Sequence, residues 1–167
     1  MILAIDIGNS TIGFGFLSGG KVVRVCKLEN EPESELFRPK LKNFFESLAT
    51  KGPWERVVVC SVVPASTKII QRKVKRFLGL TPLIVGRHLK VPIVNKYKSP
   101  RQVGRDRLLC AFAARELYGA PAVVIDLGTA ITFDGVSVKG EYLGGAIIPG
   151  LRLSAEALFE KTALLPR

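Results

Sequence analysis

The sequence DIGNST at residues 6–11 returns in altered form as DLGTAI at residues 126–131, 120 positions later. Each copy is preceded by a short apolar run rich in β-branched residues and followed by a second such run and a turn, a pattern typical of strands. The sequence therefore predicts two β-meanders, each built around an Asp-x-Gly turn. The apolar runs are residues 1–5, 12–17, 122–125 and 131–138.

Two equivalent carboxylates, Asp6 and Asp126, stand at the ends of the predicted strands. Their equivalence indicates a duplicated unit whose two turns face each other across one cleft. Such a cleft would suit a nucleotide, because a strand-end carboxylate can hold Mg²⁺ and a glycine lets the backbone approach a phosphate. The polar side chains and N–H groups of the turn could bind anions. A strand follows each turn, so neither is a Walker A loop. The alternative is an ordinary hairpin that Asp and Gly merely shape.

The composition is that of a globular chain: 167 residues, 47% hydrophobic and 23% charged, enough for one core or two small lobes. No apolar run approaches the roughly 20 residues that cross a bilayer. Asp6 comes before a signal-peptide core could form, so we expect a cytoplasmic protein without membrane contact. Cys26, Cys60 and Cys110 lack metal-like spacing and are expected to be buried thiols. The single histidine, His88, gives little support for a zinc site or a Ser-His-Asp triad.

The remaining elements follow from hydrophobic periodicity and turn residues. The first half is predicted to have the element order βββαβαβ. The second half is predicted to contain a helix, the second meander and a last helix. Compared with the first half, it lacks the final helix and strand. Residues 89–103 are expected to be irregular because of their prolines. The predicted helices and later strands are residues 36–48, 57–63, 66–78, 82–85, 105–118 and 151–161.

Four motifs, in this order, resemble those of type III pantothenate kinases, members of the acetate and sugar kinase/heat-shock ATPase/actin superfamily. The resemblance covers essentially the whole chain. It implies an α/β fold of duplicated ribonuclease-H-like (actin-like ATPase) lobes, residues 1–103 with the phosphate loop and residues 104–167 with a linking helix and a partial second lobe. The motifs are DIGNSTIGFG from Asp6, VGRDR from Val103, DLGTAITFD from Asp126 and YLGGAIIPGLRLSAEALFEKTALLPR from Tyr142.

The resemblance also implies an activity. Members of this family transfer the γ-phosphoryl group of ATP to the primary hydroxyl of pantothenate, giving 4'-phosphopantothenate in the first step towards coenzyme A. They form homodimers and need Mg²⁺ and a monovalent cation such as K⁺ or NH₄⁺. Family members continue well beyond Arg167, so we expect the chain to associate either with a copy of itself or with a separate chain that supplies the missing elements.

The resemblance assigns roles to single residues. Asp106 would accept the proton of the attacking hydroxyl, Asp6 would lie near Mg²⁺, and Asp126 would bind the monovalent cation. The residues implied to bind ATP are Asp6, Ile7, Gly8, Asn9, Ser10, Thr11, Ile12, Gly13 and Thr129. The residues implied to bind pantothenate are Tyr97, Gly104, Arg105, Asp106 and Arg107. The pairs Gly144-Gly145 and Pro149-Gly150 resemble the bend beside the nucleoside.

The chemistry of these residue types fits the roles. An aspartate beside a hydroxyl can accept its proton, and arginines suit bidentate binding of a carboxylate. Asp106 could instead be a first-turn acid favoured by the helix dipole, and Tyr97 a surface residue. Cys110 stands where the family usually has Asn, four positions after Asp106 and on the same helix face.

The net charge of +11 keeps a second interpretation open: a non-catalytic regulator or partner subunit of kinase-like fold, which could bind nucleic acid and would be inactive alone because the C-terminal part is missing. A run of charge is more often a solvated face, and no nucleic-acid-binding motif accompanies it, so nucleic acid is not expected. The last helix carries an apolar stripe that we expect to be exposed and to drive association. The stripe comprises Leu151, Leu153, Ala155, Leu158 and Phe159, followed by Ala163, Leu164 and Leu165.

Overall fold

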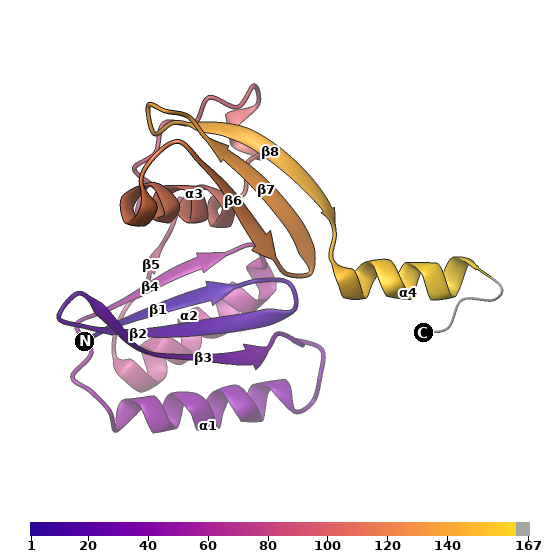
Figure 1. Cartoon of the computed structure of the whole chain (residues 1–167). Helices are drawn as coiled ribbons and strands as arrows, with labels where there is room; N and C mark the ends of the chain where they lie inside the picture. Colours follow the sequence, from indigo (N-terminus) through magenta and orange to yellow (C-terminus); the bar gives the residue numbers. More distant parts are fainter. Residues whose placement is uncertain (163–167) are drawn as a thin grey trace. The chain divides into compact units, whose positions relative to one another are not determined.

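The structure, a computed structural model, describes residues 1–162 and consists of two compact units, Met1–Lys90 and Val91–Arg167 (Figure 1). The first unit contains a five-stranded sheet of order β3-β2-β1-β4-β5, in which β4 and β5 run parallel to β1 and the meander is antiparallel. This arrangement confirms the predicted βββαβαβ order. Its elements are β1 Ile2–Ile7, β2 Thr11–Ser18, β3 Lys21–Glu29, α1 Phe37–Ala49, β4 Arg56–Ser61, α2 Pro64–Leu78 and β5 Leu83–Ile84.

The core of the first unit lies on one face of this sheet. Leu3, Ile5 and Ile7 alternate along β1 and point to the same side, as the pleat of a strand requires. Helices α1 and α2 cover that side, α1 through apolar residues spaced three and four apart, such as Leu41 and Phe45. The first meander is therefore held in place by a packed layer of helices.

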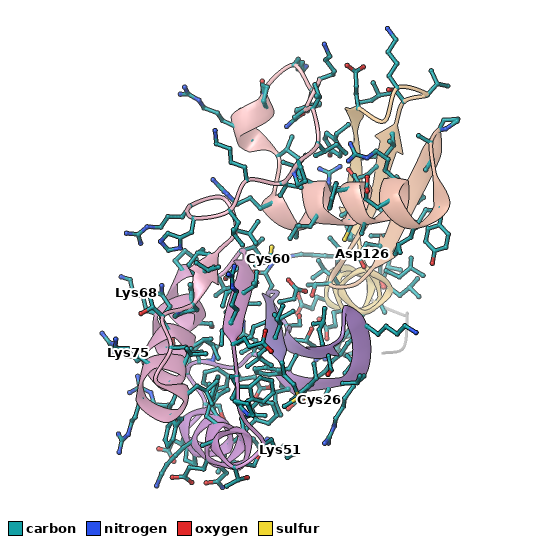
Figure 2. The ribbon with its side chains drawn as sticks, turned by 90° about the vertical axis from the view of Figure 1, so that its left-hand side faces the viewer. Cys26, Lys51, Cys60, Lys68, Lys75 and Asp126 are labelled. Atoms are coloured by element: carbon teal, nitrogen blue, oxygen red, sulfur yellow. The ribbon has the colours of Figure 1, made fainter. Side chains whose placement is uncertain are left out.

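The basic face of α2 lies on the opposite side of the helix from this core. Lys68 and Lys75 project outward from α2 in Figure 2, and both are exposed. The left-handed Gly79 ends the helix, with φ of 69°. The predicted helix is thus confirmed, although it begins earlier, at Pro64, because proline suits the first helical turn.

The second unit has a three-stranded antiparallel sheet of order β6-β7-β8, with α3 packed on one face. The irregular segment before α3 also belongs to this unit: Val94 O accepts a hydrogen bond from Tyr142 N, and Lys96 N donates one to Tyr142 O, both at 2.8 Å. The compact units thus divide before Val91, while the boundary of the duplicated lobes after Val103 stays a prediction. The elements are η1 Pro100–Gln102, α3 Arg105–Tyr118, β6 Ala122–Leu127, β7 Ala130–Val136, β8 Tyr142–Pro149 and α4 Leu151–Lys161.

The registers of the two meanders support the internal repeat. Ile5 pairs with Phe14 in the first meander, and Ile125 pairs with Phe133 in the second. The first turn is one residue longer, because Ile7 pairs with Ile12, five positions on, whereas Leu127 pairs with Ile131, four positions on.

The predicted exposure of the last helix is confirmed for the residues that the structure describes. Helix α4 continues beyond the end of β8 (Figure 1), and the exposed fraction of Leu151 is 81% and that of Leu158 is 53%. The predicted continuation of the stripe at residues 163–165 lies outside the described residues.

One expectation is wrong in part. Cys60 is buried, but Cys26 and Cys110 are only half-buried. Cys26 lies on β3, the edge strand of its sheet, where no further strand shields it. Among the described helices, none is long and apolar enough to cross a membrane.

Candidate functional site

The first Asp-x-Gly turn projects polar groups from the end of β1. Asp6 is exposed and pairs with Gly13 in the antiparallel ladder. The backbone N–H of Gly8 donates to Thr11 O at 2.9 Å and closes the turn. The side chains of Asn9, Ser10 and Thr11 are exposed at its tip. The hairpin therefore presents a carboxylate and several hydrogen-bond donors together, as a phosphate-binding turn would require.

A buried polar pair supports this turn from behind. Asn30 Nδ2 donates to Gly8 O at 2.7 Å, and Asn30 N donates to Ser10 O at 2.9 Å. Ser66 Oγ donates to Asn30 Oδ1 at 2.7 Å, and both side chains are buried. Asn30 thus connects the turn to the start of α2. We did not single out Asn30 or Ser66 from the sequence, because each stands alone in a stretch without a motif.

The second turn is built against the start of α4. Gly128 N donates to Ala130 O at 3.0 Å, and Gly150 N donates to Thr129 O at 2.9 Å. A Cβ atom added at Gly150 would lie 2.3 Å from Gly128 O, so only glycine allows this approach. The predicted bend at Pro149-Gly150 therefore does lie beside the turn that carries Thr129.

The VGRDR motif forms the beginning of α3. Gly104 is the N-cap residue, and Asp106 stands in the first turn, where the helix dipole favours an acid. A Cβ atom at Gly104 would lie 2.3 Å from Asp106 Oδ1, so the glycine leaves space for the carboxylate to fold back over the helix start. Arg105, the next residue, is exposed.

Arg107 is engaged by a buried carboxylate on β7. Its Nε donates to both oxygens of Asp134, at 3.0 and 3.1 Å, and its Nη2 donates to Oδ1 at 2.6 Å. Tyr142 Oη donates to the same Oδ1 at 2.6 Å, and Thr132 Oγ1 donates to Oδ2 at 3.3 Å. Asp134 is 1% exposed. These three donors satisfy a charge that would be costly to bury alone.

Two pKa values respond to this network. Burial, followed by the hydrogen bond to Asp134 and its charge, raises the pKa of Tyr142 well above its usual value. Burial lowers the pKa of Arg107, but the hydrogen bonds and charge of Asp134 more than offset this, so that its pKa is raised. The phenol therefore stays protonated and the guanidinium stays charged.

Asp134 and Tyr142 are functional candidates that sequence reasoning missed. Both belong to quoted motifs, Asp134 as the last residue of DLGTAITFD and Tyr142 as the first of the fourth motif. The available signal was an aspartate at an alternating strand position, where an apolar residue would be usual. Its partner, Arg107, lies 27 positions away in the sequence, so the pairing depends on the fold.

Tyr97 is half-buried and packs on the core of the second unit, so it is more than a surface residue. A Cβ atom at Gly144, where φ is 114°, would lie 2.5 Å from Tyr97 Cδ2. One at Gly145 would overlap the backbone carbonyl of Phe133 and would lie 2.9 Å from Arg107 Nη2. Gly144 therefore makes room for the ring of Tyr97, and Gly145 allows β8 to approach the backbone of β7 beside Arg107.

The second unit thus brings together most of the predicted pantothenate-binding residues. Tyr97 lies beside Gly144 on β8, and Arg107 binds Asp134 on β7. Asp126 pairs with Thr132, which is bonded to Asp134, so all three lie on the face of the sheet that receives Arg107. Residues 6–13 belong to the first unit, and their sharing one cleft with Asp126 stays a prediction.

Metal binding would rest on few protein ligands. Within residues 1–162, no group of three or more His, Cys, Asp or Glu side chains could hold a metal ion. Mg²⁺ does not require such a group, since it is usually bound through one or two carboxylates together with substrate phosphates and water. The exposed Asp6 fits such a role.

The comparisons with known proteins agree on one family. The profile of the family described as type III pantothenate kinase matches residues 2–167. A type III pantothenate kinase from Persephonella marina is 46% identical over 171 residues, which cover 100% of this chain and 67% of the relative. One from Finegoldia magna is 41% identical, with 100% and 65% covered. The chain thus spans about two thirds of the length of these relatives.

Solved structures show the same fold at low sequence identity. A Campylobacter jejuni protein named for the Baf family of transcriptional activators has a TM-score of 0.57 at 21% identity, covering 96% of this chain and 60% of that one. The Aquifex aeolicus Ppx/GppA phosphatase has a TM-score of 0.52 at 13% identity, with 96% and 56% covered. These neighbours confirm the predicted ribonuclease-H-like (actin-like ATPase) fold. With the match to its sequence profile and these curated relatives, the chain belongs to the type III pantothenate kinase family.

Proposed function

We propose that this chain takes part in the ATP-dependent phosphorylation of pantothenate to 4'-phosphopantothenate, the first step of coenzyme A biosynthesis. The observation that carries the proposal is the cluster at the start of α3, where Asp106 stands between the exposed Arg105 and the anchored Arg107. The cluster combines a carboxylate able to accept a proton with cations able to bind a carboxylate substrate. The family to which the chain belongs, type III pantothenate kinase, is named after this reaction.

In the proposed reaction, the primary hydroxyl oxygen of pantothenate attacks the γ-phosphorus of ATP. The bond from this phosphorus to the β–γ bridging oxygen breaks, ADP leaves, and the hydroxyl proton passes to Asp106. Most of the catalysis is positioning and charge stabilisation, as is general for phosphoryl transfer. Residues 6–13 and Thr129 would hold the phosphates through turn N–H groups and hydroxyls.

The proposal includes the cations that the family resemblance implies. Mg²⁺ would be held by Asp6 together with the phosphates of ATP, and it would neutralise charge on those phosphates. A monovalent cation, K⁺ or NH₄⁺, would be bound by Asp126. A homodimer, or a second chain that completes the fold, and a location in the cytoplasm stay predictions as well.

The experiment is an assay of ADP release that depends on both ATP and pantothenate, with ATP binding measured by calorimetry. Asp106→Asn should reduce kcat at least about 10²-fold while ATP binding changes little, since general bases contribute about 10²–10⁴-fold. Arg105→Gln, one position away, should raise KM for pantothenate and keep most of kcat. If Asp106→Asn leaves turnover nearly intact, Asp106 is a helix-start acid and the proposed chemistry is wrong.

A regulator that binds nucleic acid remains the second candidate. The observation in its favour is the basic outer face of α2, where Lys68, Arg72, Lys75 and Arg76 are all exposed. Contacts between such residues and DNA phosphates would give an affinity that does not depend on base sequence and falls steeply as the salt concentration rises. A titration of a DNA duplex at several salt concentrations separates the two candidates: a steep salt slope without pantothenate-dependent turnover supports the regulator.

A further inference from the structure

The buried carboxylate of Asp134 holds Arg107 in one orientation. We infer that Asp134 is a positioning residue that presents the guanidinium of Arg107 to the carboxylate of the substrate. This inference rests on the proposed function, because it concerns how the same site would bind pantothenate. It differs from that proposal in assigning a role to a residue that would not touch the substrate.

The geometry of the ion pair supports this role. Asp134 binds the side edge of the guanidinium, since its oxygens accept from Nε at 3.0 and 3.1 Å and from Nη2 at 2.6 Å. A guanidinium has a second fork, formed by the outer hydrogens of Nη1 and Nη2, which matches another carboxylate. Holding one fork therefore orients the other without using it. A lysine could not act in this way, because its ammonium has no fixed fork.

The carboxylate of Asp134 is itself held in one orientation by its neighbours. Tyr142 Oη and Thr132 Oγ1 donate to the two oxygens of Asp134, and Tyr142 is fully buried. Asp134 can therefore rotate only by breaking these bonds. An arginine fixed in this way loses less side-chain entropy when a ligand binds, which is the general benefit of preorganisation.

The side chain of Arg107 is not fully enclosed. The side chain of Arg107 keeps an exposed fraction of 14%, compared with 1% for Asp134. Asp106, the proposed proton acceptor, is the preceding residue. Because the carboxylate and the primary hydroxyl are opposite ends of pantothenate, Arg107 would hold the end of the substrate that does not react.

The main test compares Asp134→Asn with the wild type, using pantothenate and its alcohol analogue pantothenol, which lacks the carboxylate. An amide keeps the shape but removes the charge that orients Arg107. We expect KM for pantothenate to rise about 10- to 100-fold, as for loss of a charge-assisted hydrogen bond, while KM for ATP changes less than about 2-fold. With pantothenol, the KM of Asp134→Asn should differ little from that of the wild type.

Two further variants keep the test decisive if Asp134→Asn folds poorly. Tyr142→Phe removes one hydrogen bond to Asp134 and should raise KM for pantothenate in the same direction by a smaller factor. Val136→Ala is the matched control: Val136 is buried in the same cluster and pairs with Tyr142, but it has no polar group. It should lower stability and leave both KM values as they are.

The outcomes separate this inference from the function on which it rests. Two results with an active wild type would overturn the positioning role. In the first, Asp134→Asn raises KM equally for pantothenate and pantothenol. In the second, Asp134→Asn leaves KM for pantothenate unchanged. A wild type without pantothenate-dependent turnover would overturn the proposed function and this inference with it. Solvent exchange of the Arg107 Nε–H, measured by NMR, should be slow in the wild type and faster in Asp134→Asn; equal rates would contradict the inference without reference to activity.

Discussion

Asn30 supports the conformation of the first turn through hydrogen bonds to its backbone. Its side chain donates to Gly8 O and accepts from Ser66, away from solvent. Asn30→Ala would leave the buried Ser66 hydroxyl and the Gly8 carbonyl without this partner, and we expect a loss of about 1–3 kcal/mol in the free energy of unfolding. ATP affinity should also fall, because the turn is no longer held. Denaturant titration and calorimetry check both effects.

Ser47→Ala provides the control for Asn30→Ala. Ser47 also donates to a backbone carbonyl, that of Phe44, but it is exposed. Its loss should change the free energy of unfolding by less than about 0.5 kcal/mol. If Asn30→Ala is equally harmless, the buried pair does not support the turn.

Tyr142 gives the second unit a pH dependence of known sign. Its pKa is raised in the folded protein, so the phenol contributes stability that is fully present below the usual tyrosine pKa of about 10 and is lost as the pH rises above it. We expect the midpoint of thermal unfolding to fall as the pH rises above about 10. The slope of this midpoint against pH should be smaller for Tyr142→Phe. Identical slopes for the two proteins between about pH 9 and 11 would show that the phenol is not linked to folding.

At the scale of elements, the close approach of β8 to the second turn depends on Gly150. Gly150→Ala would place a methyl group against Gly128 O and Thr129 O. Overpacking of this kind typically costs about 1–3 kcal/mol, and here it would also displace the turn that carries Thr129. We expect a lower midpoint of thermal unfolding and weaker ATP binding. Gly135→Ala is the control, since its nearest neighbour would lie at 3.7 Å and should be tolerated.

The elements that the sequence predicted well are those with a strong local pattern. Helix α3 runs from Arg105 to Tyr118 as expected, because a glycine stands at each end and apolar residues recur between them. Strand β5 is shorter than predicted, with only Leu83 and Ile84, because just two register pairs join it to β4. Local propensity cannot indicate how far a neighbouring strand extends.

The parts of the site that the sequence did not predict are long-range contacts. Asp134 meets Arg107, and Asn30 meets Gly8 and Ser66, only because strands and helices far apart in the chain fold together. The motifs did identify the turns and the helix start that carry the candidate ligands. They could not show that Arg107 is anchored by a second carboxylate, since no spacing rule links those two positions.

At the scale of the whole molecule, the two sheets differ in how their apolar faces are covered. The face with Ile5 is buried under α1 and α2. The equivalent residues of the second sheet, Val123, Ile125 and Leu127, have exposed fractions of 71%, 55% and 75%, and no described residue covers them to the same extent. These three side chains share one face of β6 and form an exposed apolar surface of the kind that usually marks an interface, and apolar side chains of α4 are exposed as well.

We therefore expect the 167-residue chain to associate with a second copy at micromolar concentration, because burying this surface releases about 25 cal/mol per Å² of apolar area. Light scattering should give a mass above the 18.2 kDa of one chain. Ile125→Lys, at the centre of the exposed face, should shift the protein towards the monomer. Val25→Lys is the matched control, since Val25 on β3 has a similar exposed fraction of 60% and should leave the mass unchanged. A monodisperse monomer for the unaltered chain would contradict the prediction and show that this face remains exposed to solvent without causing association.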